Sequence, residues 1–300
     1  MMNQEILRSG KEREFSFTTH DFETVSKLIY EHAGIVMNDS KQDLVYSRLA
    51  RRLRVTGTGS FSDYLKLLDE KKGDEWQEFT NSLTTNLTSF FREEHHFPVL
   101  AEHLRARYDR EPNEPIVMWC SAASTGEEPY SMAMTAIQAF ESARPPVTII
   151  ATDLDTNVLK AASAGVYADE RVEKLEPKLV KRFFMRGSGQ QAGLVKVRPE
   201  LRELISFRQL NLLADKWPLR FPLDAIFCRN VMIYFDKPTQ LEILKKFEPL
   251  MREDGLLFMG HSESFFHADV NFKLRGKTVY GLAPRVTNTR SDVTKKHGLP

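Results

Sequence analysis

The sequence has few cysteines and no long apolar run. Its two cysteines, Cys120 and Cys228, lie far apart, form no C-x-x-C pair, and each fall in an apolar stretch. We therefore expect buried structural thiols rather than a nucleophile or metal ligands. A membrane-spanning helix needs roughly 18 consecutive apolar residues, and no stretch of the sequence is that long. The sequence thus predicts no transmembrane segment.

The chain also lacks an excess of charge of either sign. Its 42 Lys and Arg residues against 41 Asp and Glu residues leave a formal charge of +1. General nucleic-acid-binding domains are usually net basic, so this charge balance argues against that class of protein. It does not exclude a local basic patch. Residues 1–13 are polar, without the apolar core of a signal peptide. We expect a cytoplasmic protein.

The first part of the chain is predicted to be helical. Phe22, Val25 and Ile29 recur at helical spacing behind a start signal at residues 18–21, and Gly34 is expected to end that helix. A second helix is expected over residues 41–54, with an apolar stripe and an opposite basic face. Because 300 residues exceed one typical domain, we predict a helical N-terminal domain at 15–90 and a second domain at 91–284.

The second domain shows apolar strands that alternate with helices, the pattern of an α/β fold with a parallel sheet. The strands are predicted at residues 116–120, 147–152, 225–228 and 256–259, and the helices at 127–139, 157–164 and 239–251. Residues 182–198 have a glycine-rich centre between β-type residues, so we predict a small antiparallel β-subdomain at about 176–206. The tail, 285–300, is polar and is predicted to be disordered.

Ligands of such sheets bind at the carboxyl ends of the strands, and the first such end carries small and acidic residues. Gly126 precedes Glu127 and Glu128 at the start of a helix, without the G-x-G-x-x-G pattern of dinucleotide sites. Acidic side chains there repel phosphate and suit a cationic ligand without phosphates, such as S-adenosylmethionine. The alternative is that both glutamates only stabilise the helix start.

Two further strand ends carry candidate ligands. Asp153, after the second strand, can accept hydrogen bonds from ribose hydroxyls, and Asp155 can cap the next helix, although capping by Asp153 stays open. Tyr234, after the third strand, can offer its ring to a sulfonium, or it is an ordinary half-buried tyrosine. The adjacent His95 and His96 diverge on a helix, so a metal site is not expected.

Four stretches together resemble the chemotaxis receptor methyltransferases of the CheR type. They are SLTTNLTSFFRE (82–93), SAASTGEEPY (121–130), FCRNVMIYFD (227–236) and GHSE (260–263). The resemblance runs from about Phe22 to Leu282. It implies a helical domain, a Rossmann-like S-adenosylmethionine-dependent methyltransferase domain with a small β-subdomain, and methyl transfer to receptor glutamates, giving glutamate methyl esters and S-adenosylhomocysteine.

The resemblance also implies site residues. Cofactor contacts fall on Asn86, Thr88, Arg92, Glu128, Asp153, Asn211, Leu212, Arg229 and Asn230. Arg92 and Tyr234 are expected to flank the reacting groups. Asn86, Thr88, Asn211 and Leu212 rest on the resemblance alone, and the residues themselves do not separate Glu127 from Glu128. The acceptor glutamate is ionised at neutral pH, so no general base is required.

Partners follow from the same resemblance. The basic face of the second helix is expected to dock the acidic cytoplasmic helices of methyl-accepting chemotaxis receptors through Arg48, Arg51, Arg52 and Arg54. The glycine loop of the β-subdomain is expected to bind a tether peptide at the receptor C-terminus through Arg186, Gly187, Gly189, Gly193 and Arg198. Such a protein is expected to be recruited to membrane receptor arrays. We expect that it binds no nucleic acid, does not insert into the membrane and uses no metal.

Two other functions compete with this interpretation. A methyltransferase for RNA or a small molecule keeps the fold, but the charge balance and the missing Asn/Asp-Pro-Pro-aromatic loop disfavour it. A receptor-binding adaptor that holds S-adenosylmethionine without turnover belongs to another class. Arg92, Asp153 and Tyr234 are all present, which argues against the adaptor.

Overall fold

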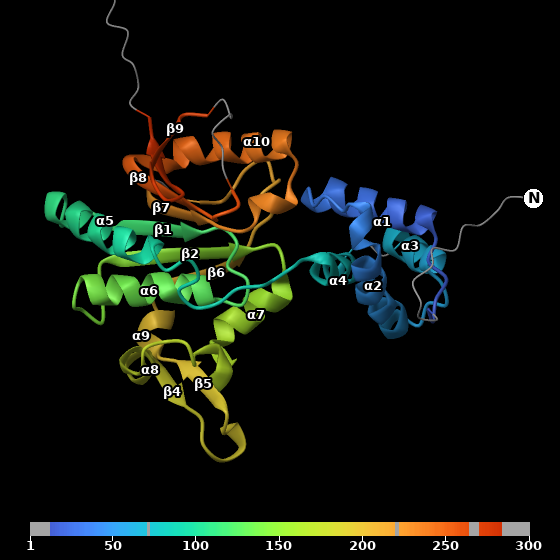
Figure 1. Ribbon diagram of the computed structural model, residues 1–300, viewed down its shortest axis with the longest axis horizontal. Helices are drawn as coiled ribbons and strands as arrows, with labels where there is room; N and C mark the ends of the chain where they lie inside the picture. Colours follow the sequence, from blue (N-terminus) through green and yellow to red (C-terminus); the bar gives the residue numbers. More distant parts are fainter. Residues whose placement is uncertain (1–12, 71–72, 220–221, 264–269, 284–300) are drawn as a thin grey trace, which may run out of the picture.

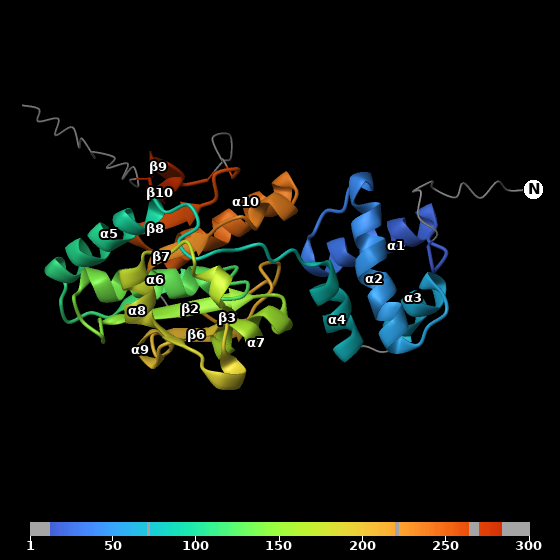
Figure 2. The same cartoon turned by 60° about the horizontal axis from the view of Figure 1, so that its bottom comes forward.

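The computed structural model describes residues 13–70, 73–219, 222–263 and 270–283. The predicted disordered tail at 285–300 lies outside this part, as does nearly all of the 1–13 segment. No helix in the described ranges is long and apolar enough to cross a membrane. The chain forms a helical part and a sheet part, which lie side by side and are joined by the segment after α4 (Figures 1 and 2).

The helical part contains α1 (Thr19–Ala33), η1 (Asp39–Lys41), α2 (Gln42–Thr56), α3 (Phe61–Glu70) and α4 (Asp74–Leu83). The predicted boundaries of the first helix are confirmed. Thr18 and Asp21 form a capping box at its start, and Gly34 ends it in the left-handed conformation, with φ of 68°. Its apolar face packs with those of the other helices into one buried cluster, so this part has a core of its own.

The main sheet has the strand order β6-β2-β1-β7-β8-β10-β9. Its strands are β1 (Ile116–Cys120), β2 (Val147–Asp153), β6 (Ile205–Gln209), β7 (Leu223–Cys228), β8 (Met251–Met259), β9 (Phe272–Gly276) and β10 (Val279–Leu282). The four predicted strands are present and parallel. The strands β6, β9 and β10 were not predicted. The last two make the sheet mixed, because β10 pairs antiparallel to β8 and β9 pairs antiparallel to β10.

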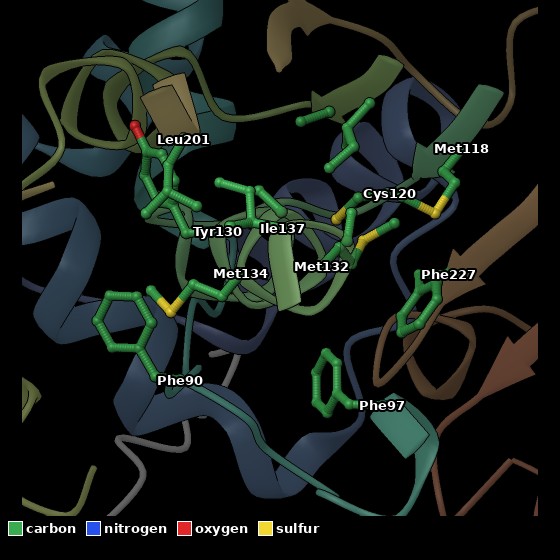
Figure 3. Packing of buried hydrophobic residues seen from close by; sticks show 14 of the residues in the cluster. Phe90, Phe97, Met118, Cys120, Tyr130, Met132, Met134, Ile137, Leu201 and Phe227 are labelled. Carbon is green, nitrogen blue, oxygen red and sulfur yellow. The ribbon is translucent and has the colours of Figure 1, made fainter. Parts of the chain in front are cut away.

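Helices cover both faces of the sheet. They are α5 (His96–Arg110), α6 (Glu127–Ala139), α7 (Thr156–Ala164) and α10 (Lys237–Phe247), followed by η5 (Glu248–Leu250). Alternate residues of β1 serve opposite faces: Met118 and Cys120 pack in the cluster with α5 and α6, and Trp119 packs in the cluster with α10. Figure 3 shows the first of these clusters. Both cysteines are buried and free, as predicted.

A second, three-stranded antiparallel sheet has the order β3-β5-β4. It is built from β3 (Val166–Ala168), β4 (Phe184–Arg186) and β5 (Leu194–Val197), with η2 (Asp169–Arg171), α8 (Pro177–Phe183), η3 (Gly189–Gln191) and α9 (Pro199–Arg202) around it. The predicted hairpin is confirmed as the pair β4–β5. The third strand, β3, lies before the predicted range of about 176–206. It was not predicted as part of the subdomain, because its pairing with β5 joins two separate segments of the chain and leaves no local pattern.

Candidate active site

A pocket lies at the edge of the sheet where β1, β2 and β7 end. It contains about 1020 Å³ of empty space, a volume that includes open solvent at its mouth. The pocket is also lined by the segment that joins α4 to α5 and by Ile35, Met37 and Lys41 from the α1–α2 connection. The helical part therefore supplies one wall of the pocket, and the sheet part and the α4–α5 segment supply the rest.

The structure gathers the predicted site residues in this pocket. It is lined by Asn86, Thr88, Arg92, Glu128, Asp153, Asn211, Leu212, Arg229, Asn230 and Tyr234. They come from three strand ends, from the α4–α5 segment and from the residues after β6. Sequence reasoning missed Ile35, Met37 and Lys41, and nothing in their local pattern indicates a site, because only the tertiary fold brings the helical part here.

Asp153 lies at the end of β2 with its side chain almost fully buried. Its Oδ2 accepts the N–H of Ser124 at 2.8 Å and its Oδ1 accepts the N–H of Asp155 at 3.0 Å. Burial raises the pKa of Asp153 to about 6, although these N–H bonds oppose the rise. Asp155 caps α7 by accepting from two backbone N–H groups, as predicted. The two aspartates thus have different places: only Asp153 lines the pocket.

The turn between β1 and α6 brings backbone close to its neighbours. Gly126 has φ of 100°, and a Cβ placed on it would lie 2.9 Å from Cβ of Ala162 and 2.9 Å from the hydroxyl of Tyr167. Only glycine fits both the conformation and the space. Ser124 in the same turn also has a positive φ, of 48°, and its N–H points at Asp153. Gly126 therefore allows this turn to pack closely, and the turn carries Ser124, which lines the pocket.

The structure separates the two glutamates that the sequence did not. Glu128 lines the pocket, where its carboxylate accepts from Nη1 of Arg229 at 2.9 Å and from the thiol of Cys120 at 3.2 Å. Glu127 is fully buried away from the pocket lining and is paired with Arg171 and with the hydroxyl of Thr125. Glu127 therefore anchors the neighbouring segment, and Glu128 is the one available to a ligand.

Arg229 joins two carboxylates beneath the pocket. Besides Glu128, its guanidinium lies 3.3 Å from the carboxylate of Glu93, and it donates to the backbone carbonyl of Arg92. Burial raises the pKa of Glu128, while Arg229 opposes the rise. Burial also acts on Glu93, but Arg229 and hydrogen bonds outweigh it and lower the pKa of Glu93. Two carboxylates share one buried guanidinium, so the group can still take up a cation.

Arg92 and Tyr234 line the pocket from two different segments of the chain, Arg92 from the α4–α5 segment and Tyr234 from the residues after β7. Nη1 of Arg92 donates to the carbonyl of Leu87 at 2.8 Å, and among the described residues its other side-chain N–H groups have no hydrogen-bond partner, so they are available to a ligand. Tyr234 belongs to η4 (Met232–Tyr234), and its carbonyl accepts the N–H of Val36 at 2.9 Å. Nζ of Lys41 lies 5.7 Å from the centre of the Tyr234 ring. The ring thus already faces a cationic group in the pocket.

The residues that rest on the resemblance alone have structural partners as well. Nδ2 of Asn86 donates to Asp155 at 2.8 Å, and Nδ2 of Asn211 donates to the carbonyl of His32 at 2.8 Å. Leu212 is buried. These bonds tie the α4–α5 segment and the residues after β6 to the strand end and to the helical part. They explain why residues distant in sequence meet at one pocket.

The four arginines of α2 have different environments. Arg48 donates from Nη1 to the carbonyls at the end of α4, at 2.6 Å to Thr84 and 3.1 Å to Leu83. Arg52 forms a paired ion contact with Glu75, and Arg54 pairs with Glu14 near the surface. Arg51 is exposed. The predicted basic face is therefore partly occupied inside the helical part, and its accessible members are Arg51 and Arg54.

The predicted tether-peptide residues surround the β4–β5 hairpin. Gly189 and Gly193 have φ of 59° and 83°, and a Cβ on Gly187 would lie 2.0 Å from the carbonyl oxygen of Gln191. Arg186 lies 3.4 Å from Asp169, and Arg198 donates to the carbonyl of Lys181 at 3.4 Å. Arg186 and Arg198 both line a second hollow beside β4, and β4 is one edge of the small sheet.

Comparisons with known proteins show which family the chain resembles. Residues 86–280 match the family model described as "CheR methyltransferase, SAM binding domain", and residues 20–84 match "CheR methyltransferase, all-alpha domain". The chain is similar to "Chemotaxis protein methyltransferase 2" of Pseudomonas aeruginosa, with 52% identity over 271 residues that cover 90% of this chain and 96% of that protein.

A second relative gives the same result. The "Chemotaxis protein methyltransferase" of Escherichia coli is 52% identical over 263 residues, which cover 87% of this chain and 90% of that protein. Among solved structures, PKMT2 from Rickettsia typhi matches with a TM-score of 0.33 and 12% identity over 58% of this chain and 26% of its own, too distant to bear on the assignment. The matched models and relatives span both parts of the chain, and the chain belongs to the CheR methyltransferase family.

Proposed function

We propose that this protein transfers a methyl group from S-adenosylmethionine to glutamate carboxylates of chemotaxis receptors, giving glutamate methyl esters and S-adenosylhomocysteine. The observation that carries the proposal is the pocket in which Asp153, Glu128 and Arg229 meet Arg92 and Tyr234. Members of the family to which the chain belongs are named chemotaxis protein methyltransferases. The pocket and the family point to the same reaction.

The residues of the pocket fit S-adenosylmethionine. Asp153 offers a buried carboxylate at a strand end, where such a group accepts bonds from both hydroxyls of a ribose. The Glu93–Arg229–Glu128 group has one carboxylate more than it has guanidinium, which suits the ligand's amino group. Apolar side chains of Leu210 and Leu212 can cover an adenine. A phosphate would meet Glu128 at the helix start, so a nucleotide fits less well.

The chemistry needs orientation more than proton transfer. When bound, S-adenosylmethionine supplies an electrophilic methyl group on a positively charged sulfur. An acceptor glutamate, with a pKa near 4.3 in a model peptide, is ionised at neutral pH and needs no base. The guanidinium of Arg92 can hold that carboxylate in a forked pair of hydrogen bonds. Tyr234 and the walls of the pocket fix the direction of approach and exclude water.

Receptor binding is proposed to use two surfaces. Arg51 and Arg54 on α2, together with Arg48 and Arg52, would attract the acidic helices of the receptor. The edge of β4, with Arg186, Gly187, Gly189, Gly193 and Arg198, would add a C-terminal tether peptide as a further strand. The exposed positions of Arg51 and Arg186 support this assignment. A cytoplasmic enzyme recruited to receptor arrays follows from these partners.

The division of labour between the parts of the chain belongs to the same proposal. We take residues 15–90 as a domain that docks the receptor and closes one wall of the pocket, and residues 91–284 as the methyltransferase domain. The separate apolar cluster of the helical part supports this division. The contribution of Lys41 to the pocket indicates that the two domains act together.

The test is methyl transfer from labelled S-adenosylmethionine to the isolated cytoplasmic domain of a chemotaxis receptor. The wild-type protein is expected to label the receptor, and Asp153→Ala is expected to abolish labelling because it removes the proposed ribose contact. Calorimetry of S-adenosylhomocysteine binding runs beside it. Binding without transfer to any receptor domain would favour the adaptor that holds the cofactor without turnover.

A further inference from the structure

Glu263 binds the backbone of a loop that lines the pocket. Glu263 itself is not part of the pocket lining. Its side chain is buried, with 3% exposed. Oε2 accepts the N–H of Asn230 at 2.9 Å and that of Gly260 at 2.7 Å, and Oε1 accepts the N–H of Met232 at 2.8 Å. Within the described part of the chain, these donors to the Glu263 carboxylate are all backbone N–H groups. One carboxylate thus joins the end of β8 to residues 229–235, here called the β7–α10 loop.

The β7–α10 loop adopts a conformation that needs such support. Asn230 has φ of 58°, in the left-handed region, which asparagine tolerates better than most residues with a side chain but which is still uncommon. Gly260 approaches the loop so closely that a Cβ on it would lie 2.9 Å from the backbone nitrogen of Asn230 and 2.8 Å from Oε2 of Glu263. The contact therefore requires glycine at position 260 and an acceptor at position 263.

A second side chain holds the carbonyl groups of the same loop. Gln240 of α10 is 8% exposed, and its Nε2 donates to the carbonyl of Met232 at 2.8 Å and to that of Phe235 at 3.0 Å. Glu263 accepts from the N–H groups of the loop, and Gln240 donates to its carbonyl groups. Tyr234 lies between these attachment points, and it lines the pocket together with Asn230.

We propose that Glu263 is a positioning residue of the active site, which fixes the β7–α10 loop so that Asn230 and Tyr234 face the bound cofactor, with Gln240 as its counterpart on the carbonyl side. A buried carboxylate is costly to keep ionised, and burial raises the pKa of Glu263 despite the N–H bonds. A carboxylate is nevertheless suited to this place because it has only acceptors, and all of its partners are donors. The proposal deepens the proposed function and rests on it for the identity of the ligand.

Glu263→Gln tests the proposal by removing half of the acceptor capacity at constant shape. The amide nitrogen would face a backbone N–H, so the loop should lose its fixed conformation. We expect S-adenosylhomocysteine to bind at least about tenfold more weakly by calorimetry, since an unsatisfied buried donor costs about that much. We also expect kcat to fall while KM for the receptor stays within about threefold, because the docking surfaces are untouched.

Asp224→Asn is the matched control. Asp224 is 1% exposed and accepts the N–H of Val117 at 2.8 Å, but it lies in β7 at the end away from the pocket. This variant should lose thermal stability and keep wild-type affinity for S-adenosylhomocysteine. An equal loss of affinity in both variants, measured well below both Tm values, would show a general effect of destabilisation and overturn the proposal.

Gln240→Met keeps the proposal testable if Glu263→Gln does not fold. It removes the donor to two carbonyl groups at similar size, and it should weaken S-adenosylhomocysteine binding in the same direction. Wild-type affinity in a folded Gln240→Met or Glu263→Gln protein would contradict the positioning role. Failure of the proposed function would look different, because the wild-type protein would then bind no S-adenosylhomocysteine or transfer no methyl group.

Discussion

At the scale of single residues, Asp153 combines burial with a place for a ligand. Its pKa is raised to about 6 because the carboxylate is buried at the end of β2. Hydrogen bonds from ribose hydroxyls favour the ionised form. Below that pH, Asp153 should therefore lose a proton when the cofactor binds. Above that pH, Asp153 is already ionised, and binding should release no proton from it.

This coupling predicts a pH dependence of affinity. As pH rises from about 5 towards 6, the Kd of S-adenosylhomocysteine should fall by up to about tenfold and then level off above about pH 7. Asp153→Asn cannot ionise, so its weaker binding should not vary over this range. Calorimetry at several pH values checks this. The same slope in Asp153→Asn would mean that another group titrates.

Arg92 is the residue whose geometry, rather than charge, should matter. We predict that Arg92→Lys lowers kcat/KM at least about tenfold, because an ammonium group cannot form the forked pair with a carboxylate. Steady-state methylation of receptor domains measures the change. Arg105→Lys, an exposed change on α5, is the matched control and should have no effect. Near-wild-type turnover in Arg92→Lys would refute the orienting role.

At the scale of elements, the turn before α6 depends on Gly126 in two ways. Its positive φ disfavours any side chain, and a Cβ would contact Ala162 and Tyr167 at 2.9 Å. We predict that Gly126→Ala lowers the free energy of unfolding by about 2–4 kcal/mol and weakens S-adenosylhomocysteine binding. Gly57→Ala shares the positive φ but has open space around it, so it should cost only about 1 kcal/mol. Equal costs in urea unfolding would show that packing at Gly126 is unimportant.

The sequence predicts elements well where a pattern is local. The capping box at Thr18 and the left-handed Gly34 define α1, and apolar runs define the central strands. The strand β9 is largely exposed and lies at the sheet edge, so it has no apolar run to recognise. The helix α5 was missed although Phe97, Leu100 and Leu104 have helical spacing, because charged residues interrupt the stripe and Pro98 resembles a break.

The candidate site divides in the same way. Glu128 and Asp153 follow apolar strands, and the carboxyl ends of parallel strands meet, so residue order alone brings them together. Lys41 and Asn211 reach the pocket through contacts between distant segments, such as the bond from Asn211 to the carbonyl of His32. Such contacts leave no local pattern. The choice between Glu127 and Glu128 likewise depends on the ion pair with Arg171.

At the scale of the whole molecule, the proposed docking of acidic receptor helices on a near-neutral chain requires a local basic surface. Arg48 and Arg52 are engaged within the helical part, whereas Arg51 is exposed. We predict that Arg51→Glu raises KM for the receptor about threefold to tenfold at low salt, and less at high salt, where charges are screened. Arg105→Glu changes the net charge equally, and a similar rise in that variant would contradict docking through α2.

Transfer of the methyl group to a receptor carboxylate, rather than to another acceptor, defines the proposed reaction. The most direct measurement is the release of label from the methylated receptor domain by mild base. The label should leave as methanol, as expected of a carboxyl ester, and the Asp153→Ala variant should incorporate none. Label that stays on the receptor after base treatment, or label found only on RNA or a small molecule, would contradict it.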